Sequence, residues 1–333
     1  MNQMRRLAAS LAVAAVVTGL VACGSNGGTK NGPGAAEPAT APPTSTAPAG
    51  TFKPVGDEPE GIVYDPVTNL VAVAVRNPDR LLLLDPGTLA VRRSVALPGS
   101  VRHLQLGRPG GPVLVPAESA SQIVQVVLPG GATRANGVQK QPHDAAEAAN
   151  GDIVVGNEFG KSISIVRAGK VIKTIADLKQ PGGVIADGDT IGVVDVGAFT
   201  LSTYDLATLT RTARVSAGSG PTHGSLIGGD RIIVSNTRGN QMLVYSVAPL
   251  KQVGALALPG TPYGMAVDAS TGTVWVTLTA RNEVVGLDVS TNTPKVIARY
   301  PTVRQPNTVA VAPGGKRLWI TGTADGVVQR IDR

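Results

Sequence analysis

The feature that most constrains the fold is a phrase of about 40 residues that recurs along the chain. Each copy holds short runs rich in Val, Ile and Leu that are separated by turn residues, which is the pattern of antiparallel strands joined by tight turns. The copies begin at intervals of 39 to 44 residues, near Pro59, Ser100, Pro142, Pro181, Pro221, Pro262 and Pro306. Repeats of this length with up to four strands each are typical of propeller blades, so the sequence predicts a seven-bladed β-propeller with four-stranded antiparallel blades.

The alternatives do not fit this repeat. A helical repeat of similar length would space its apolar residues at a period of 3.6, whereas these runs are short, β-branched and bounded by glycine. A two-sheet sandwich would not repeat its phrase seven times. Aromatic residues are only 3% of the chain, against 42% for all hydrophobic residues, so the core must be built from Val, Ala, Leu and Ile.

The last copy of the repeat lacks its fourth strand. It ends at Arg333 after three runs, while the segment "TFKPV" at 51–55 precedes the first copy. An open ring would leave strand edges unpaired. We therefore expect residues 51–55 to add the outer strand of the last blade, which makes 51–333 one all-β domain closed by an N-terminal strand.

Two copies carry a family resemblance. The stretches "TVWVTLTARNEVVGLDVSTN" and "PNTVAVAPGGKRLWITGTADGVVQRID" resemble the YVTN/NHL-like propeller repeats, and Trp275, Val276, Thr277 and Asp288 match that pattern. The resemblance covers residues 51–333. It implies the fold rather than an activity, because propellers of this kind carry many functions.

The N-terminal region predicts export and a lipid anchor. A basic start and an apolar run make residues 1–22 a signal peptide. Cys23, the single cysteine, lies in "LVACGS", which resembles a bacterial lipobox, so we expect acylation at Cys23 and attachment to the extracytoplasmic side of the cell membrane. Residues 23–50 then form a lipidated Cys and a Gly/Pro/Ala/Thr-rich disordered tether. An ordinary cleaved signal with an incidental cysteine, or a retained membrane anchor, is the alternative.

The charge pattern bears on the partners. The net charge of +7 includes Arg5 and Arg6 of the signal peptide, and the other basic residues are scattered without a run. Nucleic acid requires a basic patch and is not expected. The expected partners are the membrane, through the lipid at Cys23, and an envelope protein, a glycan or a small ligand. The sequence leaves the oligomeric state open.

The candidate site consists of the three histidines and two acids. His103, His143 and His223 lie 40 and 80 residues apart, each near the start of a copy, at positions matched elsewhere by glycine or threonine (Gly61, Gly183, Gly264, Thr308). Asp144 adjoins His143, and Glu60 lies at the same level of the first blade. The innermost strand of a blade lines the central channel. The histidines are thus predicted to share one level of the channel mouth.

Two interpretations of these residues stay open. Imidazoles with a carboxylate suit Zn²⁺ or a similar divalent ion, and histidine carries protons near neutral pH. Virginiamycin-lyase and gluconolactonase-type propellers use channel-mouth residues with a divalent ion. The histidines of this sequence resemble those sites in location, but the motifs of those propellers are not reproduced here. Alternatively, the histidines are structural and donate to neighbouring backbone carbonyls.

No nucleophile elbow, phosphate loop or dinucleotide motif occurs in the sequence. No cofactor is expected except a divalent metal. The sequence favours a binding or scaffolding module of the cell envelope. A metal-assisted hydrolase or lyase at the channel mouth is the alternative, so whether the chain is an enzyme is left open.

Overall fold

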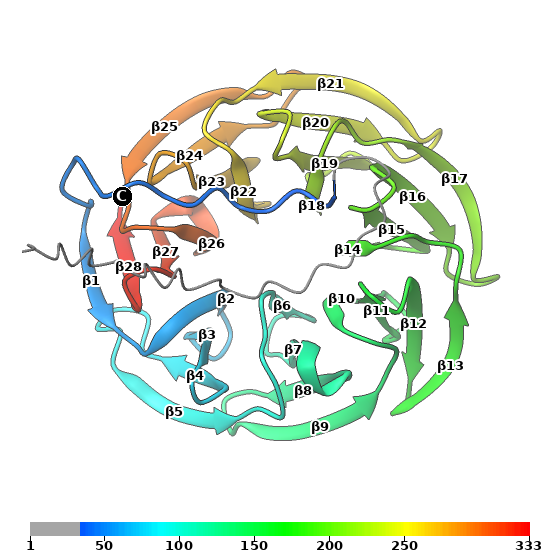
Figure 1. Ribbon diagram of the computed structural model, residues 1–333, viewed down its shortest axis with the longest axis horizontal. Helices are drawn as coiled ribbons and strands as arrows, with labels where there is room; N and C mark the ends of the chain where they lie inside the picture. The colour runs from blue at the N-terminus through cyan, green and yellow to red at the C-terminus, as the bar shows by residue number, and fades with distance from the viewer. Residues whose placement is uncertain (1–33) are drawn as a thin grey trace, which may run out of the picture. The chain divides into compact units, whose positions relative to one another are not determined.

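The computed structural model describes residues 34–333, which form seven four-stranded antiparallel sheets arranged in a ring (Figure 1). The predicted signal peptide, Cys23 and the first part of the predicted tether lie outside the described residues. The predicted all-β, seven-bladed propeller is confirmed. Among residues 34–333, no helix has the length and apolar character needed to cross a membrane.

The strands of each blade follow one another from the channel to the rim. Blades 1 to 3 comprise β2 (Asp57–Asp65), β3 (Leu70–Arg76), β4 (Arg80–Leu84), β5 (Val91–Ala96); β6 (Gln105–Leu106), β7 (Val113–Ala117), β8 (Gln122–Val127), β9 (Ala132–Gly137); β10 (Pro142–Glu147), β11 (Ile153–Asn157), β12 (Ser162–Arg167) and β13 (Lys170–Ile175). Blades 4 to 6 comprise β14 (Pro181–Asp187), β15 (Thr190–Asp195), β16 (Thr200–Asp205), β17 (Thr210–Ser216); β18 (Pro221–Leu226), β19 (Arg231–Asn236), β20 (Gln241–Ser246), β21 (Lys251–Ala257); β22 (Pro262–Asp268), β23 (Thr273–Leu278), β24 (Glu283–Asp288) and β25 (Lys295–Pro301). Blade 7 comprises β26 (Pro306–Val311), β27 (Arg317–Gly322), β28 (Val327–Asp332) and β1 (Thr51–Pro54), and two short 3₁₀ turns, η1 (Glu118–Ala120) and η2 (Pro313–Gly315), complete the elements.

Burial follows strand position within a blade. The second strand β11 is buried at every residue, whereas the outermost strand β13 is exposed over its first four. Apolar side chains of neighbouring blades pack against each other, as Ile163 and Ile165 of blade 3 do with Ile191 and Val193 of blade 4. A strand that is covered on both faces by adjacent blades needs a continuous apolar run rather than an alternating one, which explains the composition of the second and third runs.

The ring is closed as the sequence predicts. Strand β1 pairs antiparallel with β28, with Thr51 opposite Arg330 and Pro54 opposite Val327. The backbone N–H of Val55 also donates to the carbonyl of Gly326 (2.9 Å). The last blade therefore takes its outer strand from the N-terminal side of the domain, and β28 is not left as an open edge.

Residues 34–50 differ from the disordered tether that their composition predicts. The first part of this segment, residues 34–42, crosses blades 5, 6 and 7 on the face of the ring where the innermost strands begin (Figure 1). We call residues 34–42 the strap. Ala36 and Ala41 are 8% and 2% exposed. The strap is ordered because loop side chains of the ring hydrogen-bond to its backbone, which composition alone does not indicate.

Candidate functional site

The three histidines lie where innermost strands begin, on the face crossed by the strap. His103 precedes β6, His143 is the second residue of β10, and His223 is the third residue of β18. The prediction that the histidines occupy equivalent positions of the repeat is wrong by one residue for His143 and His223. Pro142 and Pro221 pair with the last residues of β11 and β19, so His143 follows its opening proline by one position and His223 by two.

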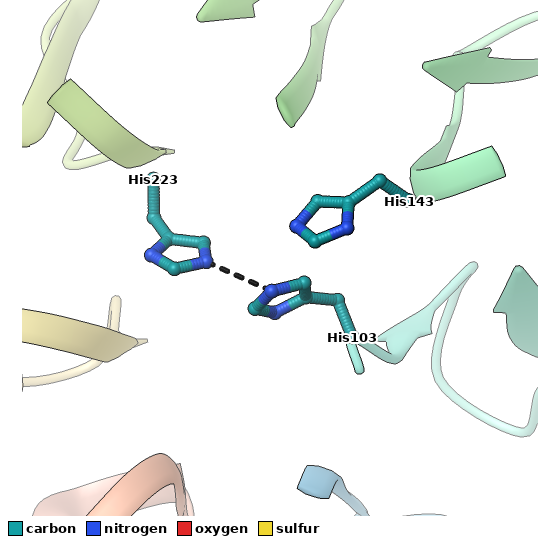
Figure 2. Close-up of side chains that lie close together, drawn as sticks. All are labelled: His103, His143 and His223. Atoms are coloured by element: carbon teal, nitrogen blue, oxygen red, sulfur yellow. Dashed lines mark hydrogen bonds between the residues drawn. The ribbon is translucent and has the colours of Figure 1, made fainter. Parts of the chain in front are cut away.

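The ring nitrogens nevertheless converge. Nε2 of His223 lies 3.1 Å from Nε2 of His103, and one ring nitrogen of each of the three histidines lies within 4.8 Å of the others. The ring centroid of His103 is 4.4 Å from that of His223 and 4.5 Å from that of His143. Figure 2 shows His103 and His223 linked through these nitrogens, with His143 turning one ring nitrogen toward the pair. Three blades thus contribute one imidazole each to a single point.

Two buried glutamates hold the outer side of His143. Its Nδ1 lies 2.8 Å from Oε1 of Glu118 and 3.4 Å from Oε2 of Glu158. Because a carboxylate accepts, Nδ1 carries the proton of this hydrogen bond. Arg102 lies between the same acids, with Nε 3.0 Å from Glu118 and a terminal nitrogen 3.1 Å from Glu158. The ring of His143 is therefore fixed in orientation and tautomer.

Burial and charge separate the pKa values of the three imidazoles. Burial lowers the pKa of His223 to about 3, with positive charge at His143 adding to the effect and the backbone of Tyr263 opposing it. Burial and the neighbouring rings lower the pKa of His103 well below its usual value. Burial and Arg102 also lower the pKa of His143, but the two glutamates outweigh them and raise it. The metal-free site thus has two neutral imidazoles beside one that is stabilised in its charged form.

The arrangement fits a divalent transition-metal ion. Two histidine nitrogens bound to Zn²⁺ at 2.0–2.1 Å in tetrahedral geometry lie about 3.3 Å apart, close to the 3.1 Å between His103 and His223. Metal-bound histidines usually donate their other ring N–H to a carboxylate, as His143 does to Glu118. The residues that would hold the ion are His103, His143 and His223.

The two predicted acids lie apart from the imidazole nitrogens. Asp144 accepts from Nε2 of Gln105 (2.9 Å) and from the backbone N–H of Val184 (2.8 Å) on the channel wall. Burial raises its pKa to about 6. Glu60 accepts instead from Arg76 (3.1 Å) and Asn307 (3.0 Å). Neither acid is brought to the point where the histidines meet.

Cavities lie on both sides of the histidines. One of about 490 Å³ extends from His103 and His223 along the innermost strands to their far ends, past Asp144 and Ser225. On the other side, Ala36 and Glu37 of the strap cover a small space that His143 and His223 also line. The larger cavity has the size of a small-molecule site. The strap covers the histidines on the side that faces away from this cavity.

Sequence reasoning missed Glu118, Glu158 and Arg102. A signal for the two glutamates was present, because they lie 40 residues apart, like His103 and His143, and each directly follows a second strand. The other blades have Asn, Val or Thr at this position, so the acids are confined to the blade that carries His143 and the blade before it. Arg102 has no comparable signal, because only the packed structure places its guanidinium between these acids.

The comparisons with known proteins agree with the ring. The chain is a seven-bladed β-propeller. No protein-family model matches it, and no curated protein matches its sequence. Among solved structures, it is similar to virginiamycin B lyase from Staphylococcus aureus, with 16% identity over 84% of this chain and 99% of that chain and a TM-score of 0.71. It is also similar to a chain of Kuenenia stuttgartiensis hydrazine synthase (16% identity, 83% and 96% covered, TM-score 0.70) and one of a mitotic checkpoint complex (13%, 91% and 99%, 0.73). At these identities the likeness shows the fold alone.

Proposed function

We propose that this protein is a lipid-anchored propeller of the bacterial cell envelope that binds a divalent transition-metal ion through His103, His143 and His223 and a small ligand beside it. The observation that carries the proposal is the convergence of three imidazoles, one of them held from behind by Glu118. The cavity of about 490 Å³ provides the space for the ligand.

The chemistry of the donors supports a borderline ion such as Zn²⁺. Neutral imidazole nitrogens are preferred ligands of Zn²⁺, Cu²⁺ and Ni²⁺, whereas Mg²⁺ and Ca²⁺ prefer oxygen. Three protein ligands leave a coordination position for water or a ligand group. Gln105, Asp144 and Ser225 then supply polar contacts on the wall of the channel.

Metal analysis tests this proposal. Protein purified without a polyhistidine tag should contain one metal ion per chain, and zinc titration of the chelator-treated protein should give the same stoichiometry. Alanine in place of any one histidine should weaken zinc binding by at least about 100-fold, and Glu118→Gln by about 10- to 100-fold, because an outer hydrogen bond to a ligand has that effect.

A matched control separates the site from burial in general. Glu60 is a buried acid on the same face that contacts Arg76 and Asn307 instead of the histidines. Glu60→Gln should leave zinc affinity unchanged. Protein that binds no stoichiometric metal, together with histidine variants that lose thermal stability, would instead support the structural role of the histidines.

A metal-assisted lyase or hydrolase is the second candidate, favoured by Asp144. This carboxyl lies on the channel wall beside His143, and its pKa of about 6 suits proton transfer near neutral pH. Quinupristin is the first substrate to assay, because the lyase of similar fold was crystallised with it. Consumption of quinupristin by zinc-loaded protein that is lost in Asp144→Asn and in His143→Ala would support this candidate. Consumption that persists in both variants would contradict it.

The anchor at Cys23 is part of the proposal and rests on the lipobox-like "LVACGS". Palmitate labelling in a bacterial host should mark the chain, and Cys23→Ser should abolish the label and release the protein from the membrane fraction. Persistent membrane attachment of the unlabelled variant would contradict a lipid anchor.

A further inference from the structure

The strap is held by side chains that recognise its backbone. The amide of Gln305 donates from Nε2 to the carbonyl of Ala39 (2.9 Å) and accepts at Oε1 from the N–H of Ala41 (2.8 Å). Thr279 accepts from the N–H of Ala39 (3.0 Å). One glutamine thus brackets two alternate residues of an extended chain, much as a neighbouring strand would.

Further contacts extend this pattern along the strap. Asn282 donates to the carbonyl of Pro42 (2.9 Å), and a terminal nitrogen of Arg238 donates to that of Gly34 (2.6 Å). The strap side chains that are buried are the methyl groups of Ala36 and Ala41. Recognition therefore depends mainly on an extended backbone and on small side chains, with the carboxylate of Glu37 near Arg102 as the one charged contact of the strap.

The strap has the properties of a bound peptide rather than of a part of the ring. It joins none of the seven sheets, and residues 42–47, which connect it toward β1, are exposed. Its departure would leave every strand pair intact, including β1 with β28. We infer that this face is a peptide-binding surface, that the strap occupies it in cis, and that an extended Ala/Pro-rich peptide binds there in trans when the strap leaves.

Occupancy of this surface controls access to the histidines. Ala35, Ala36 and Glu37 cover the small space lined by His143 and His223, and Glu37 lies 3.6 Å from Arg102. A chain without the strap would expose the histidines on this face. The peptide surface itself does not depend on a bound metal, because Gln305, Thr279 and Asn282 belong to blades 6 and 7 and none of them is a candidate ligand.

The probe is a fluorescent peptide with the sequence of residues 34–45, GAAEPATAPPTS. It is titrated into a variant that lacks residues 34–46 but keeps Ala49 and β1. We expect saturable binding by this variant and at least tenfold weaker binding by the unaltered chain, in which the strap competes. Gln305→Ala in the deletion variant should weaken binding about 10- to 30-fold, because two hydrogen bonds are lost.

Gln141 provides the matched control. It directly precedes the opening proline of blade 3, as Gln305 precedes that of blade 7, and it lies outside the strap contacts. Gln141→Ala should leave the affinity unchanged, and a peptide N-methylated at the residue corresponding to Ala41 should bind about tenfold more weakly. Absence of binding to the folded deletion variant, or equal binding by Gln305→Ala, would overturn the inference.

A second variant covers failure of the deletion to fold. Ala36→Asp with Ala41→Asp in the full chain places carboxylates at two buried positions and should displace the strap without removing residues. The peptide must then bind this variant more tightly than the unaltered chain, and equal affinities would again overturn the inference.

Discussion

Ring closure by β1 gives the sharpest stability prediction. The perturbation is a pair of truncations: one begins at Ala49 and removes the strap, and the other begins at Asp57 and removes β1 as well. Strand β1 forms four residue pairs with β28, and all four of its residues are exposed. Closure therefore depends on backbone hydrogen bonds, since little apolar surface is buried.

The magnitude follows from that ladder. Half of the pairs in an antiparallel ladder exchange two hydrogen bonds, which gives about four bonds for four pairs. The shorter chain also loses the hydrogen bond from Val55 to Gly326 and the two that join Ala49 to Pro301 and Gln329. At about 1 kcal/mol net for each of about seven bonds, its free energy of unfolding should be lower by about 7 kcal/mol. With an unfolding entropy of about 2.1 cal/mol/K per residue, a domain of this size should melt about 10–15 °C lower.

The assay is thermal unfolding of the two truncations followed by circular dichroism, with light scattering recorded in parallel. The shorter chain should melt lower than the longer one and should aggregate on heating, because β28 becomes an open edge. Midpoints within about 2 °C of each other would refute the reasoning, because they would mean that β1 contributes almost nothing to the closed ring.

Three further predictions concern single residues. Trp319→Phe should cost about 1–2 kcal/mol more in the free energy of unfolding than Trp275→Phe, because the indole of Trp319 donates to a backbone carbonyl of blade 1 (2.9 Å), whereas that of Trp275 has no partner among the described residues. Gly264→Ala should lower the free energy of unfolding in a denaturant titration by at least about 2 kcal/mol, because its new methyl would clash with the backbone carbonyl of Asn307 in blade 7. The new methyl of Gly137→Ala meets nothing within 4 Å, so this variant should stay within about 0.5 kcal/mol in the same titration. Burial raises the pKa of Asp144 to about 6, above its unfolded value, so the metal-free protein should lose stability relative to Asp144→Asn as the pH rises from about 4 to about 6, and a pH-independent difference would contradict this.

The blades could be predicted from the sequence because each is specified locally. Pro142, Pro181, Pro221, Pro262 and Pro306 each begin an innermost strand in the structure, where the repeat places them. Closure by residues 51–54 followed from counting strands in the last copy. Turn residues and apolar runs act within a few residues of one another, so one chain suffices to show them.

The strap and the site geometry could not be predicted in this way. Composition suggests disorder for residues 34–42, because they bury little apolar surface, but their order comes from ring side chains more than 200 residues away, such as Gln305. The exact level of the histidines depends on bulges at the start of β10 and β18, which sequence spacing does not reveal. That the three imidazoles would be near one another was nonetheless inferred from blade periodicity.

The strap also determines how mechanical force would enter the molecule. If Cys23 carries the proposed lipid, the chain from Cys23 to Gly34 spans at most about 40 Å when fully extended. The start of the strap would then stay within that distance of the bilayer. Tension between the membrane and anything that grips the ring would act first on the hydrogen bond between Gly34 and Arg238, and next on those at Ala39 and Ala41. Such a force would break the contacts of the strap one after another and would expose the histidines before it acted on the pairing of β1 with β28.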